Sequence, residues 1–170
     1  LKSYGEKMTD EEKVFRIDKI QKEIQYMVQL LNDVLVIGRV ESGNFIFTPD
    51  IVNLKELCQE IIEEVITSYD SKNEIILSFK GEYRKVYLNE KIIRHIVINL
   101  LSNAIKYSPS GSKVYFDLIF GTDEVIFSFK DEGIGIPQGD IEKLFEPFYR
   151  SSNVGDIHGT GLGLTIVNKS

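Results

Sequence analysis

Two asparagines and a lysine share one face of a predicted helix in the middle of the chain. In the segment INLLSNAIKY, Asn99 and Asn103 are one helical turn apart and lie on the same side as Lys106 and Tyr107. An amide oxygen is a suitable ligand for a hard cation such as Mg²⁺, which often accompanies phosphate. We interpret Asn103 as a Mg²⁺ ligand and Lys106 as a charge for phosphate oxygens. The alternative is that both amides are inert surface groups.

A carboxylate follows a predicted strand at the start of the sequence DEGIGIP. Asp131 is placed to accept a hydrogen bond from an exocyclic amine such as that of adenine, whereas guanine has an oxygen at the corresponding place. Gly133 and Gly135 would let the backbone approach the base, although two glycines in a loop often only relieve strain. This pattern predicts a preference for ATP over GTP.

Two further segments carry groups suited to phosphate. The sequence FEPFYR follows a predicted one-turn helix that Asp140 could cap. It ends in Arg150, whose planar guanidinium suits a terminal phosphate, while its phenylalanines are expected to anchor the loop on the core. The sequence GTGLGL places Gly159, Gly161 and Gly163 directly before a predicted helix, where backbone amides can form an anion cradle. No Gly-Lys-Ser/Thr follows and no strand precedes it, so it is neither a Walker motif nor a dinucleotide-binding motif.

Hydrophobic patterning predicts an α+β scaffold that positions these segments. Strands are expected at residues 74–80, 85–88, 113–120 and 124–130, and a short strand at 45–47. Helices are expected from a capping box at Asn53 to about Tyr69, with Cys58 in its apolar face, and over residues 90–106. Together they indicate a sandwich of helices on one side of a mixed sheet. The core-facing side of the second helix is predicted to carry Ile93, Ile96, Val97, Leu100 and Ala104.

The N-terminal part of the chain predicts a long helix. The capping box that begins at Thr9 starts a helix near Asp10, whose apolar residues then recur at steps of three and four up to Val34. The stripe is wide, which favours a four-helix bundle over a core helix of a single domain. With a turn at Gly5, residues 1–43 are predicted to form a helical hairpin, half of a dimeric bundle, and residues 44–170 a second domain.

Composition excludes several classes of protein. The chain has 170 residues and a net charge of −6, which disfavours non-specific nucleic-acid binding. A single cysteine allows no intrachain disulfide, and no apolar run is long enough to cross a membrane. We expect a cytoplasmic chain, or the cytoplasmic part of a membrane sensor that is anchored by segments outside this sequence.

The four motifs NLLSNAIKYS, DEGIGIP, FEPFYR and GTGLGL resemble, in this order, the N, G1, F and G2 boxes of sensor histidine kinases of two-component systems. The resemblance implies a Bergerat-type ATP-binding fold of the GHKL class, preceded by the second helix of a dimerisation and phosphotransfer hairpin. It implies ATP and Mg²⁺ as cofactors, with Asn103 as the metal ligand and Asn99, Lys106 and Arg150 as catalytic residues. The implied nucleotide-binding residues are Asn99, Asn103, Lys106, Tyr107, Asp131, Gly133, Gly135, Ile136, Phe148, Arg150, Gly159, Thr160, Gly161, Leu162, Gly163 and Leu164.

The chain departs from the family pattern in two ways. The family's phosphoacceptor histidine has no match, because neither His95 nor His158 has the required acidic neighbour, and both are expected to be surface residues. The chain also stops at Ser170, before the last helix and strands that the family usually has, so we expect a C-terminally incomplete domain. The resemblance implies a homodimer, a response-regulator receiver domain as partner, and no autophosphorylation by this chain alone.

Two other functions remain open from the sequence. The first is an ATP hydrolase related to gyrase, the mismatch-repair ATPases or the heat-shock chaperone. Those enzymes have a glutamate one turn before the metal-binding asparagine, where this chain has Asn99, and an amide cannot act as a general base. The second is a non-catalytic module for nucleotide sensing or dimerisation, which intact binding motifs disfavour.

Overall fold

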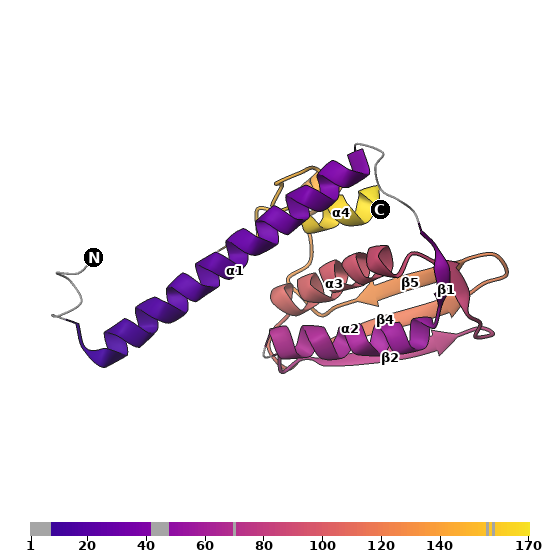
Figure 1. The fold of residues 1–170 in the computed structure, drawn as a ribbon, viewed down its shortest axis with the longest axis horizontal. Helices are drawn as coiled ribbons and strands as arrows, with labels where there is room; N and C mark the ends of the chain where they lie inside the picture. The colour runs from indigo at the N-terminus through magenta and orange to yellow at the C-terminus, as the bar shows by residue number, and fades with distance from the viewer. Residues whose placement is uncertain (1–7, 42–47, 70, 156, 158) are drawn as a thin grey trace.

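The computed structural model describes residues 8–41, 48–69, 71–155, 157 and 159–170. The predicted turn at Gly5, the strand at residues 45–47 and the domain boundary near Gly43 lie outside the described residues. A long N-terminal helix, α1 (Asp10–Glu41), projects from an α/β body that holds the remaining helices and strands (Figure 1). None of the described helices is long and apolar enough to span a membrane.

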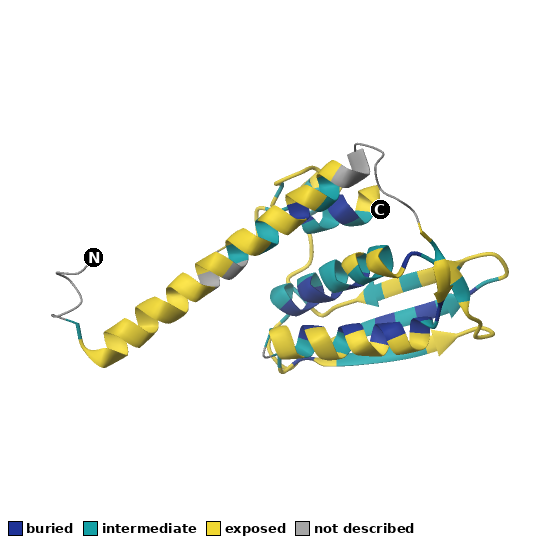
Figure 2. Cartoon of the chain, in the orientation of Figure 1, coloured by how far each residue is buried: buried dark blue, intermediate teal, exposed yellow. Residues whose placement is uncertain are grey.

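Helix α1 begins at the predicted capping box. The Thr9 amide donates to Glu12 Oε2 at 2.9 Å, and the Glu12 amide donates to Thr9 Oγ1 at 3.2 Å. The apolar stripe that follows faces solvent along most of the helix, with Phe15 70% and Met27 67% exposed (Figure 2). The stripe is therefore not part of the core that the described residues form, which disfavours the core-helix alternative.

The body is a layer of two helices on one face of a mixed sheet. Helices α2 (Leu54–Ser68) and α3 (Glu90–Tyr107) pack against each other and cover the sheet (Figure 1). The strands of this sheet are β2 (Glu74–Lys80), β4 (Lys113–Phe120) and β5 (Val125–Lys130). They lie in the order β2-β4-β5, with β2 parallel to β4 and β4 antiparallel to β5, so the sheet is mixed, as the sequence predicts. A separate antiparallel pair joins β1 (Asp50–Val52) to β3 (Val86–Leu88).

Alternating side chains of β4 form the centre of the hydrophobic core. Val114, Phe116 and Leu118 are fully buried, while the residues between them point to the other face of the sheet. Phe116 stacks on Phe129 of β5 with ring centres 4.3 Å apart. Cys58 of α2 is buried in the same cluster, and burial raises the pKa of its thiol to about 12. This confirms the structural role predicted for the cysteine.

The buried face of α3 is rotated about the helix axis by part of a turn relative to the predicted face. Val97 and Ala104 are buried as expected, but Leu101 and Ile105 complete the buried face. Leu100, which was predicted to face the core, lines a cavity on the other side of the helix. Aliphatic residues occur on more than one side of α3, so hydrophobicity alone does not define which side of the helix faces the sheet.

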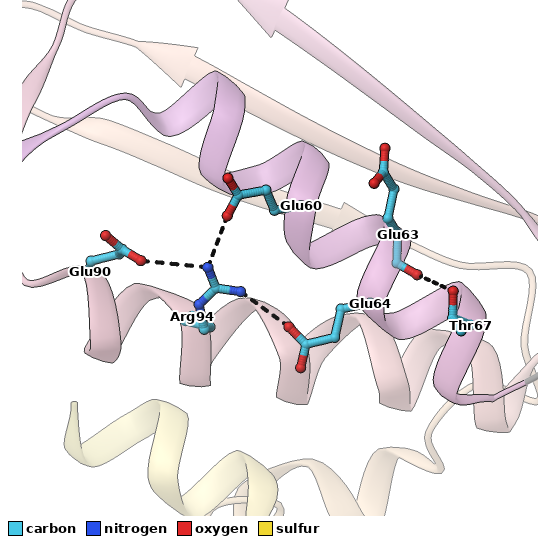
Figure 3. A network of polar contacts seen from close by, with 6 residues as sticks. All are labelled: Glu60, Glu63, Glu64, Thr67, Glu90 and Arg94. Carbon is cyan, nitrogen blue, oxygen red and sulfur yellow. Dashed lines mark hydrogen bonds and ion pairs between the residues drawn. The ribbon is translucent and has the colours of Figure 1, made fainter.

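An arginine links the solvent-exposed sides of α2 and α3. Arg94 of α3 lies 3.1 Å from Glu60 and 3.1 Å from Glu64 of α2, and 3.5 Å from Glu90 one turn earlier on α3 (Figure 3). Exposed ion pairs each contribute roughly 0–1 kcal/mol, so burial of the apolar faces contributes more to packing these helices together. In this network a single guanidinium contacts three carboxylates, two of α2 and one of α3, and so adds a polar contact between the two helices.

The C-terminal segment crosses the far side of α3. It contains a 3₁₀ helix, η2 (Gln138–Lys143), and the short helix α4 (Gly163–Lys169) that follows the glycine loop. Helix α4 packs on α3 from the side opposite to α2, so α3 lies between α2 and α4 (Figure 1). Helix α4 also contacts α1. This arrangement brings the glycine loop next to the polar face of α3.

Candidate functional site

A cavity of about 360 Å³ lies between α3, the loop after β5, the segment around Arg150 and the glycine loop. All but three of the predicted nucleotide-binding residues line it. The predicted residues that line the cavity are Asn99, Asn103, Lys106, Tyr107, Asp131, Gly135, Ile136, Arg150, Gly159, Thr160, Gly161, Gly163 and Leu164. Four motifs that are separate in the sequence therefore contribute to one concave surface, as expected of a small-molecule site.

The three exceptions are Gly133, Phe148 and Leu162, which lie outside the cavity wall. Leu162 is buried at 1% exposure beneath the glycine loop. Phe148 is exposed and adopts a φ of 64°, and its amide donates to the Gly161 carbonyl at 3.0 Å. A Cβ on Gly161 would lie 2.7 Å from the Phe148 carbonyl carbon, so only glycine fits at this contact. The three residues shape the loops that surround the cavity.

The asparagines of α3 differ in how firmly they are held. Asn99 Nδ2 donates to the His95 carbonyl at 2.9 Å, and a Cβ on Gly163 would lie 2.9 Å from Asn99 Oδ1. The Asn99 amide is therefore confined between its own helix and the glycine loop. The Asn103 side chain makes no hydrogen bond to any residue that the structure describes, and it lines the cavity. Its amide oxygen is available to a ligand. His95 is exposed, as predicted.

The donor set suits a cation that arrives with phosphate. Within the described ranges, no group of three or more His, Cys, Asp or Glu residues is arranged to hold a metal. Asn103 is a single neutral oxygen donor beside Lys106, whose ammonium lies 5.3 Å from the centre of the Tyr69 ring. Mg²⁺ is commonly held by one or two protein oxygens together with water and phosphate oxygens. The residues present fit such a metal.

Asp131 is positioned by the glycine turn that follows it. Its Oδ1 accepts a hydrogen bond from the Gly133 amide at 2.8 Å, which leaves Oδ2 without a partner among the described residues. The Ile134 amide donates to the Tyr107 carbonyl at 3.0 Å and holds the turn against the end of α3. The carboxylate therefore retains an acceptor at the cavity.

The segment after η2 carries Arg150 and corrects one prediction. Arg150 lines the cavity, and its Nη2 donates to the Ile157 carbonyl at 2.5 Å. Asp140 was predicted to cap the short helix, but the N-cap position is Pro137, and no side chain caps it. Asp140 instead accepts hydrogen bonds from residues of the Arg150 segment, such as Ser151. Its partners are nine to twelve residues away, beyond the range of a capping rule.

Helix α1 contributes residues that the sequence patterns did not assign to the site. Gln29 lines the cavity, and Tyr26 donates to the Gly159 carbonyl at 3.5 Å. Asp33, only 8% exposed, accepts a hydrogen bond from Thr160 Oγ1 at 3.0 Å. Burial raises the pKa of the Asp33 carboxyl, opposed by the Thr160 hydrogen bond and by the charges of Lys106 and His95. The only signal for this contact in the local sequence is that Asp33 is a carboxylate within the apolar stripe of the helix.

Other lining residues also escaped the sequence patterns. Asn153 Nδ2 donates to the Gly135 carbonyl at 2.9 Å and so connects the two loops that flank the cavity. Most of the others are aliphatic or aromatic, which suits the flat apolar faces of a base. The remaining lining residues are Leu100, Ser102, Ala104, Phe129, Ile134, Leu144, Tyr149, Ser151 and Val154.

Comparison with known proteins identifies the class of fold and site. Residues 88–170 match the family described as histidine kinase-, DNA gyrase B- and HSP90-like ATPases. The solved catalytic domain of the histidine kinase ThkA is 30% identical to the chain, with a TM-score of 0.58, over 72% of this chain and 78% of that domain. The chain belongs to the histidine kinase catalytic domains of this ATPase family.

Longer relatives are sensor kinases. The sensor histidine kinase WalK of Bacillus subtilis (strain 168) is 33% identical over 153 residues, which are 88% of this chain and 25% of WalK. Full-length ShkA has a TM-score of 0.74 at 24% identity, over 96% of this chain and 34% of ShkA, which shows a shared fold. The chain spans well under half the length of the curated relatives that it matches.

Proposed function

We propose that the cavity binds Mg·ATP with the adenine at Asp131 and the phosphates between the asparagines of α3, Lys106, Arg150 and the glycine loop. The observation that supports this most is the convergence of four sequence motifs on one cavity. The lining combines the Asp131 carboxylate, whose Oδ2 has no partner among the described residues, with amides, two cations and the backbone of three glycines. This set of groups suits a molecule that carries both an amine and negative charge.

The proposed reaction transfers the γ-phosphate to a histidine outside this chain, and the phosphoryl group then passes to a response-regulator receiver domain. Phosphoryl transfer depends mainly on positioning and on neutralising charge. Asn99 is confined by α3 and the glycine loop, so it can orient phosphate oxygens, while Lys106 and Arg150 supply positive charge. When bound, Mg²⁺ would neutralise phosphate charge, held on the protein side by Asn103.

The same geometry disfavours ATP hydrolysis as the main activity. A hydrolase needs a carboxylate or another base close to the phosphates to activate water. Among the described residues that line the cavity, Asp131 is the only one with a carboxylate, and it belongs to the proposed base end. At the phosphate end, Asn99 replaces the glutamate of the hydrolases, and its neutral amide has no basic group that could activate water.

The exposed stripe of α1 supports a proposal about the whole protein. Residues such as Ile17, Ile24 and Leu31 are more than half exposed, and their helical spacing suits an antiparallel bundle. We propose that residues 1–43 belong to a dimerisation and phosphotransfer hairpin of a homodimer, and residues 44–170 to the ATP-binding domain. We place the domain in the cytoplasm, with any membrane anchor in segments outside this chain.

Isothermal titration calorimetry with ATP and GTP tests the proposal through Asp131→Asn. Loss of a charged hydrogen bond costs about 1.5–3 kcal/mol, so the variant should bind ATP roughly 10- to 150-fold more weakly. Asp123→Asn, an exposed acid in the β4–β5 turn, is the matched control and should bind ATP like the wild type. Unchanged ATP affinity in Asp131→Asn would remove the carboxylate from base recognition.

A further inference from the structure

Asp140 collects hydrogen bonds from both sides of Arg150. Its Oδ1 accepts from the Tyr149 hydroxyl at 2.9 Å, and its Oδ2 accepts from the Ser151 hydroxyl at 2.5 Å. The Ser152 amide and hydroxyl also donate to Oδ2, at 2.9 and 3.1 Å. One carboxylate therefore anchors the residue before the arginine and the two residues after it.

The anchored segment is the part of the loop that faces the cavity. Tyr149, Arg150 and Ser151 all line the cavity, whereas Asp140 lies behind them in η2 and does not. No ion pair joins Asp140 to Arg150 in the part of the chain that the structure describes, so the carboxylate acts on the backbone and neighbours of the arginine. The Arg150 side chain is directed by a separate hydrogen bond to the Ile157 carbonyl.

The acceptor is maintained across the whole physiological range of pH. Hydrogen bonds from Ser151, then from the Ser152 amide and Tyr149, lower the pKa of Asp140 to about 2. The carboxylate is therefore ionised near neutral pH, and as an acceptor with two oxygens it can hold all four donors at once. A neutral amide at this position would replace one of its oxygens with a donor, which would face the donors of the loop.

We propose that Asp140 is a positioning residue that holds the 149–152 segment so that Arg150 reaches the terminal phosphate. This rests on the proposed function, in which Arg150 contacts the γ-phosphate. A flexible guanidinium must be pre-ordered to bind phosphate tightly, because ordering it at the moment of binding costs conformational entropy. Asp140 therefore contributes to the discrimination of ATP from ADP without touching the nucleotide.

The test compares ATP with ADP, because only ATP carries the phosphate that Arg150 would contact. Calorimetry should show that Asp140→Asn weakens ATP binding about tenfold while ADP affinity changes less than about twofold. The matched control is Glu142→Gln, an exposed acid in the same 3₁₀ helix, which should leave both affinities unchanged. Ser151→Ala removes one donor but keeps the carboxylate, so it should weaken ATP binding selectively but less than Asp140→Asn does. This variant also tests the inference if Asp140→Asn fails to fold.

Arg150→Ala separates the inference from the proposed function. If Arg150→Ala does not weaken ATP relative to ADP, Arg150 does not bind the γ-phosphate, and both the proposed role of Arg150 and the inference fail. If Arg150→Ala is selective for ATP but Asp140→Asn weakens ATP and ADP equally, Asp140 only braces the loop and the inference alone is overturned. If the inference holds, adding Asp140→Asn to Arg150→Ala should cause no further selective loss.

Discussion

Replacing Gly133 with alanine should damage the base end of the cavity. A Cβ at this position would lie 2.7 Å from Asp131 Oδ1 and 2.7 Å from the Tyr107 carbonyl oxygen, closer than real Cβ contacts come. The carboxylate can swing away, but the carbonyl belongs to the end of α3 and accepts the Ile134 amide at 3.0 Å. The substitution must therefore move the turn, the aspartate or both.

The magnitude follows from these two contacts. Overpacking of this kind costs about 1–3 kcal/mol, offset by about 0.4–1 kcal/mol because alanine restricts the unfolded chain. A chain of this size loses about 2–4 °C of melting temperature per kcal/mol, so a decrease of a few degrees is expected. If the displaced carboxylate also loses its hydrogen bond to the base, ATP affinity should fall roughly 10- to 150-fold.

Thermal unfolding and ATP calorimetry on Gly133→Ala, with Gly139→Ala as control, measure both effects. No atom lies within 4 Å of a Cβ built on Gly139, and its φ is not in the left-handed region, so that variant should behave like the wild type or unfold slightly higher. Wild-type ATP affinity and melting temperature in Gly133→Ala would refute the reasoning, since the turn would then tolerate a side chain against α3.

Two further predictions concern α1 and the histidines. Burial raises the pKa of Asp33 above 3.8, so the folded state favours the protonated carboxyl. The stability that this group contributes is fully present below that pH and is lost as the pH rises through the raised pKa. Asp33→Asn resembles the protonated carboxyl, so its melting temperature should exceed that of the wild type by more at about pH 7 than at about pH 4. A melting-temperature difference that is the same at both pH values would contradict this. Incubated alone with γ-labelled ATP, the chain should remain unlabelled, because neither His95 nor His158 is followed by an acidic residue; an acid-labile phosphohistidine at either one would disprove it.

Local patterns predicted most of the secondary structure. The capping box at Thr9 and the alternation along β4 depend on neighbours within a few residues, so the sequence alone indicates them. The rotation of α3 was not predictable in the same way. Leu100 and Leu101 have identical side chains, and only the position of the sheet relative to the cavity determines that Leu101 is buried.

Contacts between distant segments were beyond the reach of the sequence. Asp140 carries a capping residue type close to the start of a helix, yet its partners come from a loop that folds back on it. Asp33 and Thr160 are 127 residues apart, and no periodicity relates a helix stripe to a glycine loop. Which donor meets which acceptor depends on how whole elements pack.

The sequence by itself determined the chemistry of the site: the amides, the carboxylate, the cations and the glycines that a nucleotide would need. It also determined their local backbone, because motif spacing and turn residues act over a few positions. The tertiary structure alone decided that α1 closes one side of the cavity, that Phe148 and Leu162 lie outside its wall, and that Asp140 lies behind Arg150. The physical reason is that these arrangements result from the packing of several elements against a shared core, and no single segment contains that information.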